Sequence, residues 1–525
     1  MTVTGQQLIA GVPVEPSADR FTAHGAPGAV DEASAAHVDQ ALRAAEQAFD
    51  DYRHLAADRR AALLEGIAEE VEALGDDLLA AAHAETALPI AERLAGERAR
   101  TLRQLRLFAD LVRDGSWVDA RIDRANPALR PPRPDIRRML VPIGPVAVFT
   151  ASNFPLAFSV AGTDTASALA AGCPVVVKGH PAHPATAELT ARAVIRAVAR
   201  AGVPAGVFSL LQSTRNDIAL AVVRHPLTRA VAFTGSLTAG RALYDAGTSR
   251  PDPIPVYAEM GSINPVFLLP GALDDRAEAI ADGLFQSMTL GVGQFCTCPG
   301  VAAGIAGPAF DRFVQRMEAL VAGARPGTML YPRILQSFET GVRRVSEAGG
   351  VRTVRAALPA DAADRLATPT VFIADASAFL AHQALREEVF GPATVIVRCA
   401  SRDQLDAVAG AIDGQLTATV HGSPVDLAGH AALLAILERK AGRLIVDGFP
   451  TGVEVCASMQ HGGPYPATTD ARTTSVGTAA IDRFVRPIAY QNWPAAALPV
   501  ELQDANPRGL WRRIDGELTR DAIAG

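Results

Sequence analysis

The chain has 525 residues, more than one hydrophobic core supports, so the sequence predicts at least two large domains. Hydrophobic residues make up 49% of the chain, as in an ordinary soluble globular enzyme. The net charge is −7 and the sequence contains no long basic run, so nucleic acid is not expected as a partner. The sequence shows neither a leader pattern nor an apolar stretch of membrane-spanning length, so we expect no membrane contact and a cytoplasmic location.

A helical layer and a β-hairpin are predicted early in the chain. Apolar residues recur at helical spacing between Ala56 and about Arg113. From Ser116 to Gly144, two alternating segments flank a proline-rich turn, which is typical of a hairpin. Neither segment has an obvious partner strand next to it in sequence, so the hairpin is a candidate interface element.

Strands and helices then alternate, as in a parallel sheet covered on both faces. Short apolar runs occur at 146–150, 175–177, 207–211 and 230–233, with alanine-rich helical segments at 161–171 and 185–201. Such sheets bind ligands beyond the carboxyl ends of their strands. The residues there include Ser152, Lys178 and Gly235, a set that suits a nucleotide.

A second alternating region extends from a strand at 266–269 to about Leu444. It is followed by a long irregular stretch, 449–477, and long irregular connections are usually functional. A further strand is predicted at 481–490, and no internal repeat of fixed period is found.

Cys296 is the candidate nucleophile, because it lies in a glycine-rich loop beside Gln294 and thiolates attack carbonyl carbon. Its neighbour Cys298 suggests a metal clip, but no second cysteine or histidine pair stands nearby, so no metal is expected. The other three cysteines are interpreted as small buried apolar residues: Cys173, Cys399 and Cys456. The odd total of five argues against a disulfide framework.

No Gly-x-Gly-x-x-Gly follows a strand in this region, so the common dinucleotide fingerprint is absent. Gly235 and Ser236 precede a helical segment, and a helix start can bind a pyrophosphate. The same pair is also an ordinary helix cap. His180 and His183 are each followed by proline, which disfavours a zinc pair and favours a structural or cofactor-rim role.

Several separated motifs, in this order and spacing, resemble the aldehyde dehydrogenase superfamily over about 480 residues. They are Ser152-Asn153-Phe154-Pro155, Phe233-Thr234-Gly235-Ser236, Glu259-Met260-Gly261-Ser262, Gly293-Gln294-Phe295-Cys296 and Glu388-Val389-Phe390-Gly391-Pro392. Further segments are similar to the branch of α-ketoglutaric semialdehyde (2,5-dioxovalerate) dehydrogenases, which itself resembles an NADP-linked fatty aldehyde dehydrogenase. These segments are Lys178 to Pro184, Pro204 to Gln212, Pro450 to Cys456, His461 to Thr468 and Arg472 to Gly477.

The resemblance implies an α/β fold of two doubly wound parallel-sheet domains and a β-hairpin oligomerisation flap. A cofactor-binding domain is expected at 1–258, interrupted by the hairpin at 116–143. The catalytic domain is expected at 259–448. The last segment, 449–525, would hold a substrate and cofactor loop, the return strand of the flap and the tail. A homodimer or homotetramer is implied.

The resemblance also assigns roles. Cys296 would add to the aldehyde carbon, and the Asn153 amide with the Cys296 backbone N–H would hold the oxyanion. Glu259 would be the general base, helped by a raised pKa. Lys178 would hold the hydroxyls of the adenosine-side ribose, and Glu388 those of the nicotinamide-side ribose. Ser236 would contact the pyrophosphate. The remaining cofactor-contact candidates are Ser152, His180, Pro181, Gly235 and Phe390.

Two departures from the family bear on the cofactor. Ser152 replaces a frequent tryptophan and loosens one wall of the channel. Pro181 occupies the position where members that prefer NAD commonly have glutamate, so we expect NADP to be accepted and preferred, with NAD possible.

Two substrate hypotheses remain open, and two further functions are disfavoured. A small acidic aldehyde, 2,5-dioxopentanoate by resemblance, would need an arginine at its carboxylate, with Arg472 as candidate; a structural role in its loop is the alternative. An aliphatic aldehyde would use Phe154, Phe158 and Phe295 as an apolar channel. Thioester transfer to coenzyme A is disfavoured by Glu259, and a non-catalytic binding protein by retention of Cys296, Glu259 and Asn153.

Overall fold

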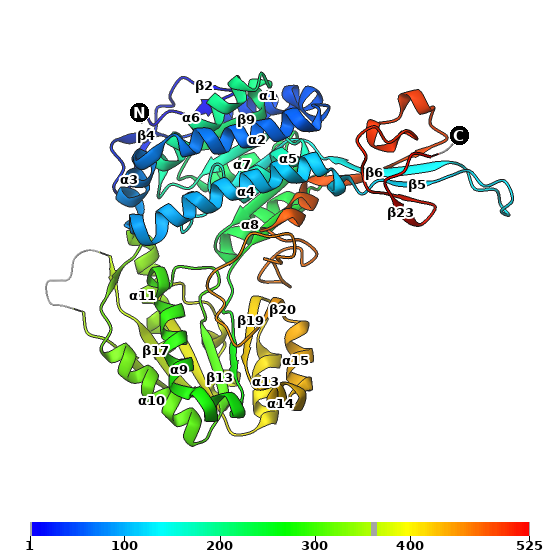
Figure 1. Cartoon of the computed structure of the whole chain (residues 1–525). Coiled ribbons are helices and arrows are strands. Elements are labelled where there is room, and N and C mark those ends of the chain that lie inside the picture. Colours follow the sequence, from blue (N-terminus) through cyan, green and yellow to red (C-terminus); the bar gives the residue numbers. More distant parts are fainter. Residues whose placement is uncertain (1–2, 359–364, 524–525) are drawn as a thin grey trace.

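The computed structural model describes residues 3–358 and 365–523; the predicted first and last segments therefore extend slightly beyond it at 1–2 and 524–525. The chain forms two seven-stranded sheets, each covered by helices, and a third sheet that projects from the body (Figure 1). The predicted α/β fold with parallel-rich sheets is confirmed. In the described part of the chain, no helix combines the length and the apolar character that crossing a bilayer requires.

The first sheet contains the strands predicted from the apolar runs. Its order is β11 (Val256–Glu259), β10 (Ala230–Thr234), β7 (Val146–Phe149), β8 (Val175–Gly179), β9 (Phe208–Gln212), β1 (Leu8–Ile9) and β2 (Val12–Pro13). The five strands from β11 to β9 are parallel, whereas β1 is antiparallel to β9.

Both faces of this sheet are buried because successive side chains of a strand point to opposite faces. Val146 and Val148 enter a core with helices from one face, whereas Ala147 and Phe149 enter a second core on the other. The first face carries α2 (Ala57–Glu72), α4 (Ala95–Asp114), α5 (Thr163–Ala171) and α6 (Pro184–Arg200). The other carries α1 (Ala35–Arg53), α7 (Asn216–Arg224) and α8 (Leu237–Thr248). Figure 1 shows α2 and α4 beside each other across the upper body, with α3 (Gly75–Thr86) at its edge.

The second sheet has the same construction. Its order is β15 (Val351–Arg355), β17 (Thr370–Asp375), β18 (Ala393–Cys399), β13 (Val301–Ile305), β12 (Val266–Leu268), β19 (Gln415–His421) and β20 (Ala441–Val446). Only β15 is antiparallel to its neighbour. One face packs against α9 (Pro270–Thr289) and α10 (Pro308–Ala322). The remaining helices of this half are α11 (Pro332–Ser346), α12 (Ala376–Ala381), α13 (Arg402–Ala411), α14 (Pro424–Gly429) and α15 (Ala431–Glu438).

The third sheet joins the predicted hairpin to the end of the chain. Its order is β21 (Val485–Gln491), β6 (Ile136–Pro142), β5 (Arg121–Asp123), β22 (Arg512–Ile514) and β23 (Glu517–Thr519). The strand predicted at 481–490 begins later, because 478–484 forms a 3-10 helix that buries Ile481 and Phe484. The tail, which had no predicted role, completes this sheet (Figure 1).

Two small sheets and several short helical turns complete the described elements. The small sheets pair β3 (Arg20–Thr22) with β4 (Ala29–Asp31) and β14 (Gly327–Thr328) with β16 (Leu366–Ala367). The helical region predicted up to Arg113 is interrupted after Leu88-Pro89, where a π-helical turn, Ile90–Leu94, leads into α4. The stretch from 449 to 477 contains no helix or strand, as predicted.

Candidate active site

The loop that carries Cys296 follows α9 and a short turn, Leu290–Gly293, and its path requires glycine. Gly293 has φ of +65°, and a Cβ there would lie 2.3 Å from the backbone of Gly391. The segment after Glu388 is thereby held against the cysteine loop. Asn264 also fixes the loop, since its side-chain amide donates to the carbonyls of Cys296 at 2.9 Å and Cys298 at 3.0 Å.

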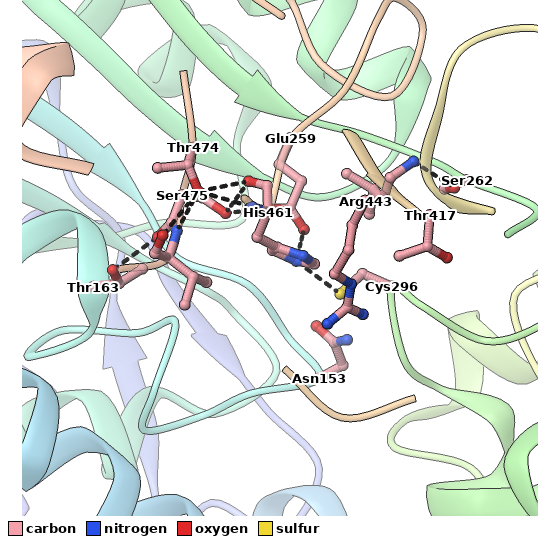
Figure 2. A network of polar contacts seen from close by, with 12 residues as sticks. Asn153, Thr163, Glu259, Ser262, Cys296, Thr417, Arg443, His461, Thr474 and Ser475 are labelled. Carbon is pink, nitrogen blue, oxygen red and sulfur yellow. Dashed lines mark hydrogen bonds and ion pairs between the residues drawn. The ribbon is translucent and has the colours of Figure 1, made fainter. Parts of the chain in front are cut away.

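Cys296, Glu259 and His461 form a compact triangle (Figure 2). The His461 Nε2 atom lies 3.4 Å from the Cys296 Sγ atom and 3.0 Å from the Glu259 Oε1 atom. Glu259 ends β11 of the first sheet, Cys296 follows α9 of the second half, and His461 comes from the irregular stretch after β20. The nucleophile therefore has an imidazole and a carboxylate within proton-transfer reach.

Backbone and hydroxyl contacts fix the orientation of this triangle. The His461 N–H donates to the Thr474 hydroxyl at 2.8 Å, and the Ser475 N–H donates to the His461 carbonyl at 2.8 Å. The Ser475 hydroxyl donates to the second oxygen of Glu259. The side chains of His461 and Glu259 are only 1% and 3% exposed, so the pair is shielded from water.

The electrostatics of the triangle favour a resting thiol beside an ionised carboxylate. Burial raises the pKa of Cys296 well above its usual value, and the charge of Glu259 raises it further. Burial acts to raise the pKa of Glu259, but the charge of His461 and hydrogen bonds from His461 and Ser475 lower it overall. The prediction of a raised pKa for Glu259 is therefore wrong, because sequence did not reveal these partners. The thiol must lose its proton to a neighbour before it attacks.

Two N–H donors are available near the Cys296 sulfur, where an oxyanion would form. Asn153, which follows β7, is 9% exposed, and its amide donates to the Gln294 carbonyl at 3.1 Å. Figure 2 places the Asn153 amide beside Cys296. In the described part of the chain the Cys296 backbone N–H makes no hydrogen bond, so it is free to donate to substrate. The arrangement suits stabilisation of a tetrahedral oxyanion.

Lys178, at the end of β8, fits a polar or anionic ligand such as a nucleotide ribose. Its ammonium has no hydrogen-bond or ion-pair partner among the described residues. Burial lowers the pKa of Lys178 to about 8, and the charge of Glu32 acts in the opposite direction. Both Glu32 oxygens already accept hydrogen bonds from Thr214. The lysine is thus a cation that lacks a committed partner.

The other residues of that rim lie together. The His180 ring stacks on His183 at 5.6 Å and lies 5.8 Å from the Tyr331 ring, whose hydroxyl interacts with Ser152. His183 is fully buried and its Nε2 atom lies 2.9 Å from the Ala151 carbonyl oxygen, which is a structural role. Pro181, which lies between the two histidines in sequence, is partly buried.

The remaining residues predicted to contact the cofactor lie at two places, the start of α8 and the pocket around Glu388. The exposed Ser236 hydroxyl caps α8, and the Gly235 N–H donates to the Glu259 carbonyl at 3.0 Å. The Glu388 carboxylate accepts from the Ser262 N–H at 3.3 Å and lies over Gly261, where a Cβ would collide with it. Burial raises the pKa of Glu388 to about 7. Glu388, Phe390 and Cys298 line one pocket that is partly open to solvent.

The three substrate-channel phenylalanines form one cluster. The Phe154 ring lies 5.4 Å from both the Phe158 and the Phe295 rings, all nearly buried. Arg472 does not join it: its side chain is 88% exposed and its guanidinium is bound by Asp470 through two hydrogen bonds. The expectation that Arg472 binds a substrate carboxylate is corrected to the alternative, a structural role in its loop.

Three cysteines were predicted to be small buried apolar residues, and the structure confirms this for two of them. Cys173 and Cys399 are buried, but Cys456 is exposed, because its loop covers no core at that point. All five cysteines are free.

Sequence reasoning assigned no role to His461, Ser475 or Asn264. His461 and Ser475 lie in the irregular stretch 449–477, and the length of that stretch was the only sign that it is functional. Both residues are far from Cys296 along the chain, so the sequence does not show that they lie near it in the fold. Asn264 follows the Glu259 motif closely, and its positive φ of 44° identifies it only once the backbone is known.

We expect His461→Asn to slow alkylation of Cys296 by iodoacetamide at pH 7 by about tenfold or more. The substitution removes the imidazole that contacts the sulfur and offsets the charge of Glu259, and so leaves the carboxylate of Glu259 alone beside the developing thiolate. Mass spectrometry of the modified peptides would measure the rate. The exposed Cys456 provides an internal control whose alkylation should not change. An unchanged rate at Cys296 would show that His461 does not act on the sulfur.

Comparisons with known proteins agree with this geometry. The model of the aldehyde dehydrogenase family matches residues 21–465. The chain is 51% identical to alpha-ketoglutaric semialdehyde dehydrogenase 2 of Azospirillum brasilense, covering 98% of this chain and 100% of that one. It is 44% identical to alpha-ketoglutaric semialdehyde dehydrogenase of Acinetobacter baylyi, covering 99% and 98%. PnpE from Pseudomonas sp. WBC-3, also solved with nicotinamide adenine dinucleotide, has the same fold, with a TM-score of 0.79, 22% identity and coverage of 93% and 97%. The chain therefore belongs to the aldehyde dehydrogenase family.

Proposed function

We propose that this enzyme oxidises 2,5-dioxopentanoate (α-ketoglutarate semialdehyde) to 2-oxoglutarate with a nicotinamide dinucleotide. The observation that carries the proposal is the near full-length identity of 51% and 44% to two relatives named for that aldehyde. The triangle of Cys296, Glu259 and His461 supports it, because it provides a nucleophile and the groups that move its proton.

The proposed reaction follows from the geometry. The Cys296 proton passes to the His461–Glu259 pair as the sulfur adds to the aldehyde carbon, and Asn153 with the Cys296 N–H holds the oxyanion. The cofactor, when bound, supplies the acceptor for the hydride that leaves this carbon. A thioester on Cys296 remains. The pair releases the Cys296 proton to solvent, and Glu259 then takes a proton from water. The resulting attack on the thioester expels the Cys296 thiolate, which regains a proton from Glu259, and the acid product leaves as carboxylate after losing its own proton.

A survey of initial rates with aldehydes of different length and charge tests the proposal. We expect the highest kcat/KM for 2,5-dioxopentanoate. A medium or long aliphatic aldehyde is the second candidate, favoured by the cluster of Phe154, Phe158 and Phe295. A clearly higher kcat/KM for the aliphatic series would replace the first candidate. Formation of product that requires coenzyme A would contradict both, because it would mean that water does not cleave the thioester.

We further propose that NADP is the preferred cofactor. Position 181 is proline, so no carboxylate there repels a 2′-phosphate, and the ammonium of Lys178 has no committed partner. Pro181→Glu is expected to lower kcat/KM for NADP by about tenfold or more, with a much smaller change for NAD. Steady-state kinetics with both cofactors measure the ratio. A wild-type enzyme that clearly prefers NAD would contradict the preference.

We also propose that the enzyme is a homodimer or homotetramer in the cytoplasm. The projecting third sheet supports the oligomer, because β21 is an edge strand with unpaired backbone groups on one side. Light scattering coupled to size-exclusion chromatography would give the mass; a monomer at micromolar concentration would contradict the proposal.

A further inference from the structure

Arg100, on α4, is a cation without a partner at the aromatic cluster. Its Nε and Nη2 atoms are buried and make no hydrogen bond within residues 3–358 and 365–523, and no ion pair involves this side chain there. The guanidinium carbon lies 5.5 Å from the centre of the Phe158 ring and 5.7 Å from that of Phe154. Burying a guanidinium without a hydrogen-bond partner costs free energy. The unpaired state of Arg100 is explained if this residue binds an anion during part of the catalytic cycle.

The neighbouring arginines do not share this property. Arg93 also lies over Phe154, but its guanidinium binds Glu97 at 2.6 Å and the Asn153 carbonyl at 3.1 Å. Arg443 lies beside Cys296 in Figure 2, but it donates to the Pro450 carbonyl at 2.9 Å and so holds the following loop. Both are occupied by the protein. Arg100 alone of the three has two adjacent guanidinium nitrogens, Nε and Nη2, that no protein group pairs with.

The position of Arg100 suits the far end of a short substrate. The Phe158 ring that contacts Arg100 lies 6.4 Å from the His461 ring, and His461 contacts the Cys296 sulfur. A five-carbon aldehyde spans about 5 Å between its terminal carbons. A molecule bound to Cys296 at one end can therefore extend along Phe158 toward the guanidinium.

Charge supports the same placement. A planar guanidinium binds a carboxylate with two parallel N–H···O hydrogen bonds.

We propose that Arg100, with Phe154 and Phe158 as its walls, forms the subsite that binds the distal carboxylate of the aldehyde substrate. The inference rests on the proposed oxidation at Cys296 and names the substrate class: a straight-chain aldehyde of four or five carbons that carries a carboxylate at the opposite end. Arg100 replaces Arg472 in this role.

The test compares matched substrates on Arg100→Met, which keeps an unbranched apolar stem and removes the guanidinium. We expect kcat/KM for 4-oxobutanoate and 2,5-dioxopentanoate to fall about 30-fold or more, mainly through KM, while kcat/KM for butanal stays within about threefold. Arg100→Lys should recover part of the loss, because it restores the charge without the guanidinium. Arg106→Met on the same helix, where Arg106 forms an exposed ion pair with Glu72, is the control and should leave both substrates unchanged.

Equal losses for charged and uncharged aldehydes in both Arg100 variants, or no loss for either, would overturn the subsite. Glutarate provides a readout that does not need turnover: it should compete with the aldehyde in the wild type and about tenfold more weakly in Arg100→Met. Glutarate inhibition that is unchanged by the substitution contradicts the inference. A wild type that prefers 4-oxobutanoate to 2,5-dioxopentanoate, yet loses this activity in Arg100→Met, would disprove the proposed physiological reaction and support the subsite.

Discussion

Replacing Cys296 by alanine is expected to lower kcat/KM for every aldehyde by at least about 10⁴-fold, because no covalent intermediate can form. The neighbouring thiol cannot substitute for it. The Cys298 sulfur lies 3.8 Å from the carbonyl oxygens of both Met288 and Gly391, and burial raises its pKa to about 12. Cofactor reduction followed by absorbance measures the activity.

Cys298→Ser serves as the matched control, since it alters a thiol two residues away without touching the triangle. It should retain activity within about tenfold of the wild type. If Cys296→Ala kept more than a few per cent of the activity, or Cys298→Ser lost as much, the nucleophile would have to be reassigned.

The second large effect is expected for Glu259→Gln, with steady-state turnover reduced by about 10²- to 10⁴-fold. Glutamine fills the same space and still contacts His461 and Ser475, but it cannot take a proton from water. His461 remains 3.4 Å from the sulfur, so the first half of the reaction should be less affected than hydrolysis of the thioester. The acyl-enzyme should therefore accumulate.

Rapid mixing and intact-protein mass spectrometry distinguish the two halves of the reaction. Glu259→Gln should give a burst of about one equivalent of reduced cofactor and a mass increase equal to one acyl group. Loss of turnover without burst or adduct would mean that Glu259 acts chiefly before the thioester forms.

The sequence was informative where local patterns determine structure. Runs such as Val175 to Val177 between helical segments required a buried parallel sheet, and the glycines around Cys296 required an accessible loop. Contacts between distant segments were not accessible in this way. His461 meets Cys296 only because the irregular stretch from 449 to 477 folds back over the ends of both sheets, and no periodicity encodes that path.

The two arginines illustrate the same limit. Arg472 was selected from its motif, but residue type does not reveal that the neighbouring Asp470 binds the side chain. Arg100 lies in the segment that helical spacing predicts between Ala56 and about Arg113, where nothing in the sequence singles it out. Its direction depends on how α4 packs against Phe154 and Phe158, which is a tertiary contact.

The third sheet has a consequence for biosynthesis. Strand β5 pairs with β22, and β6 pairs with β21. The partner strands of β5 and β6 therefore come from residues more than 340 positions further along the chain. Synthesis runs from the N-terminus, and early segments fold while later ones are still being made. The hairpin at 121–142 must therefore remain without those partner strands until the ribosome has nearly finished. The oligomer proposed above, if it forms through this sheet, therefore assembles only after nearly the whole chain has been made.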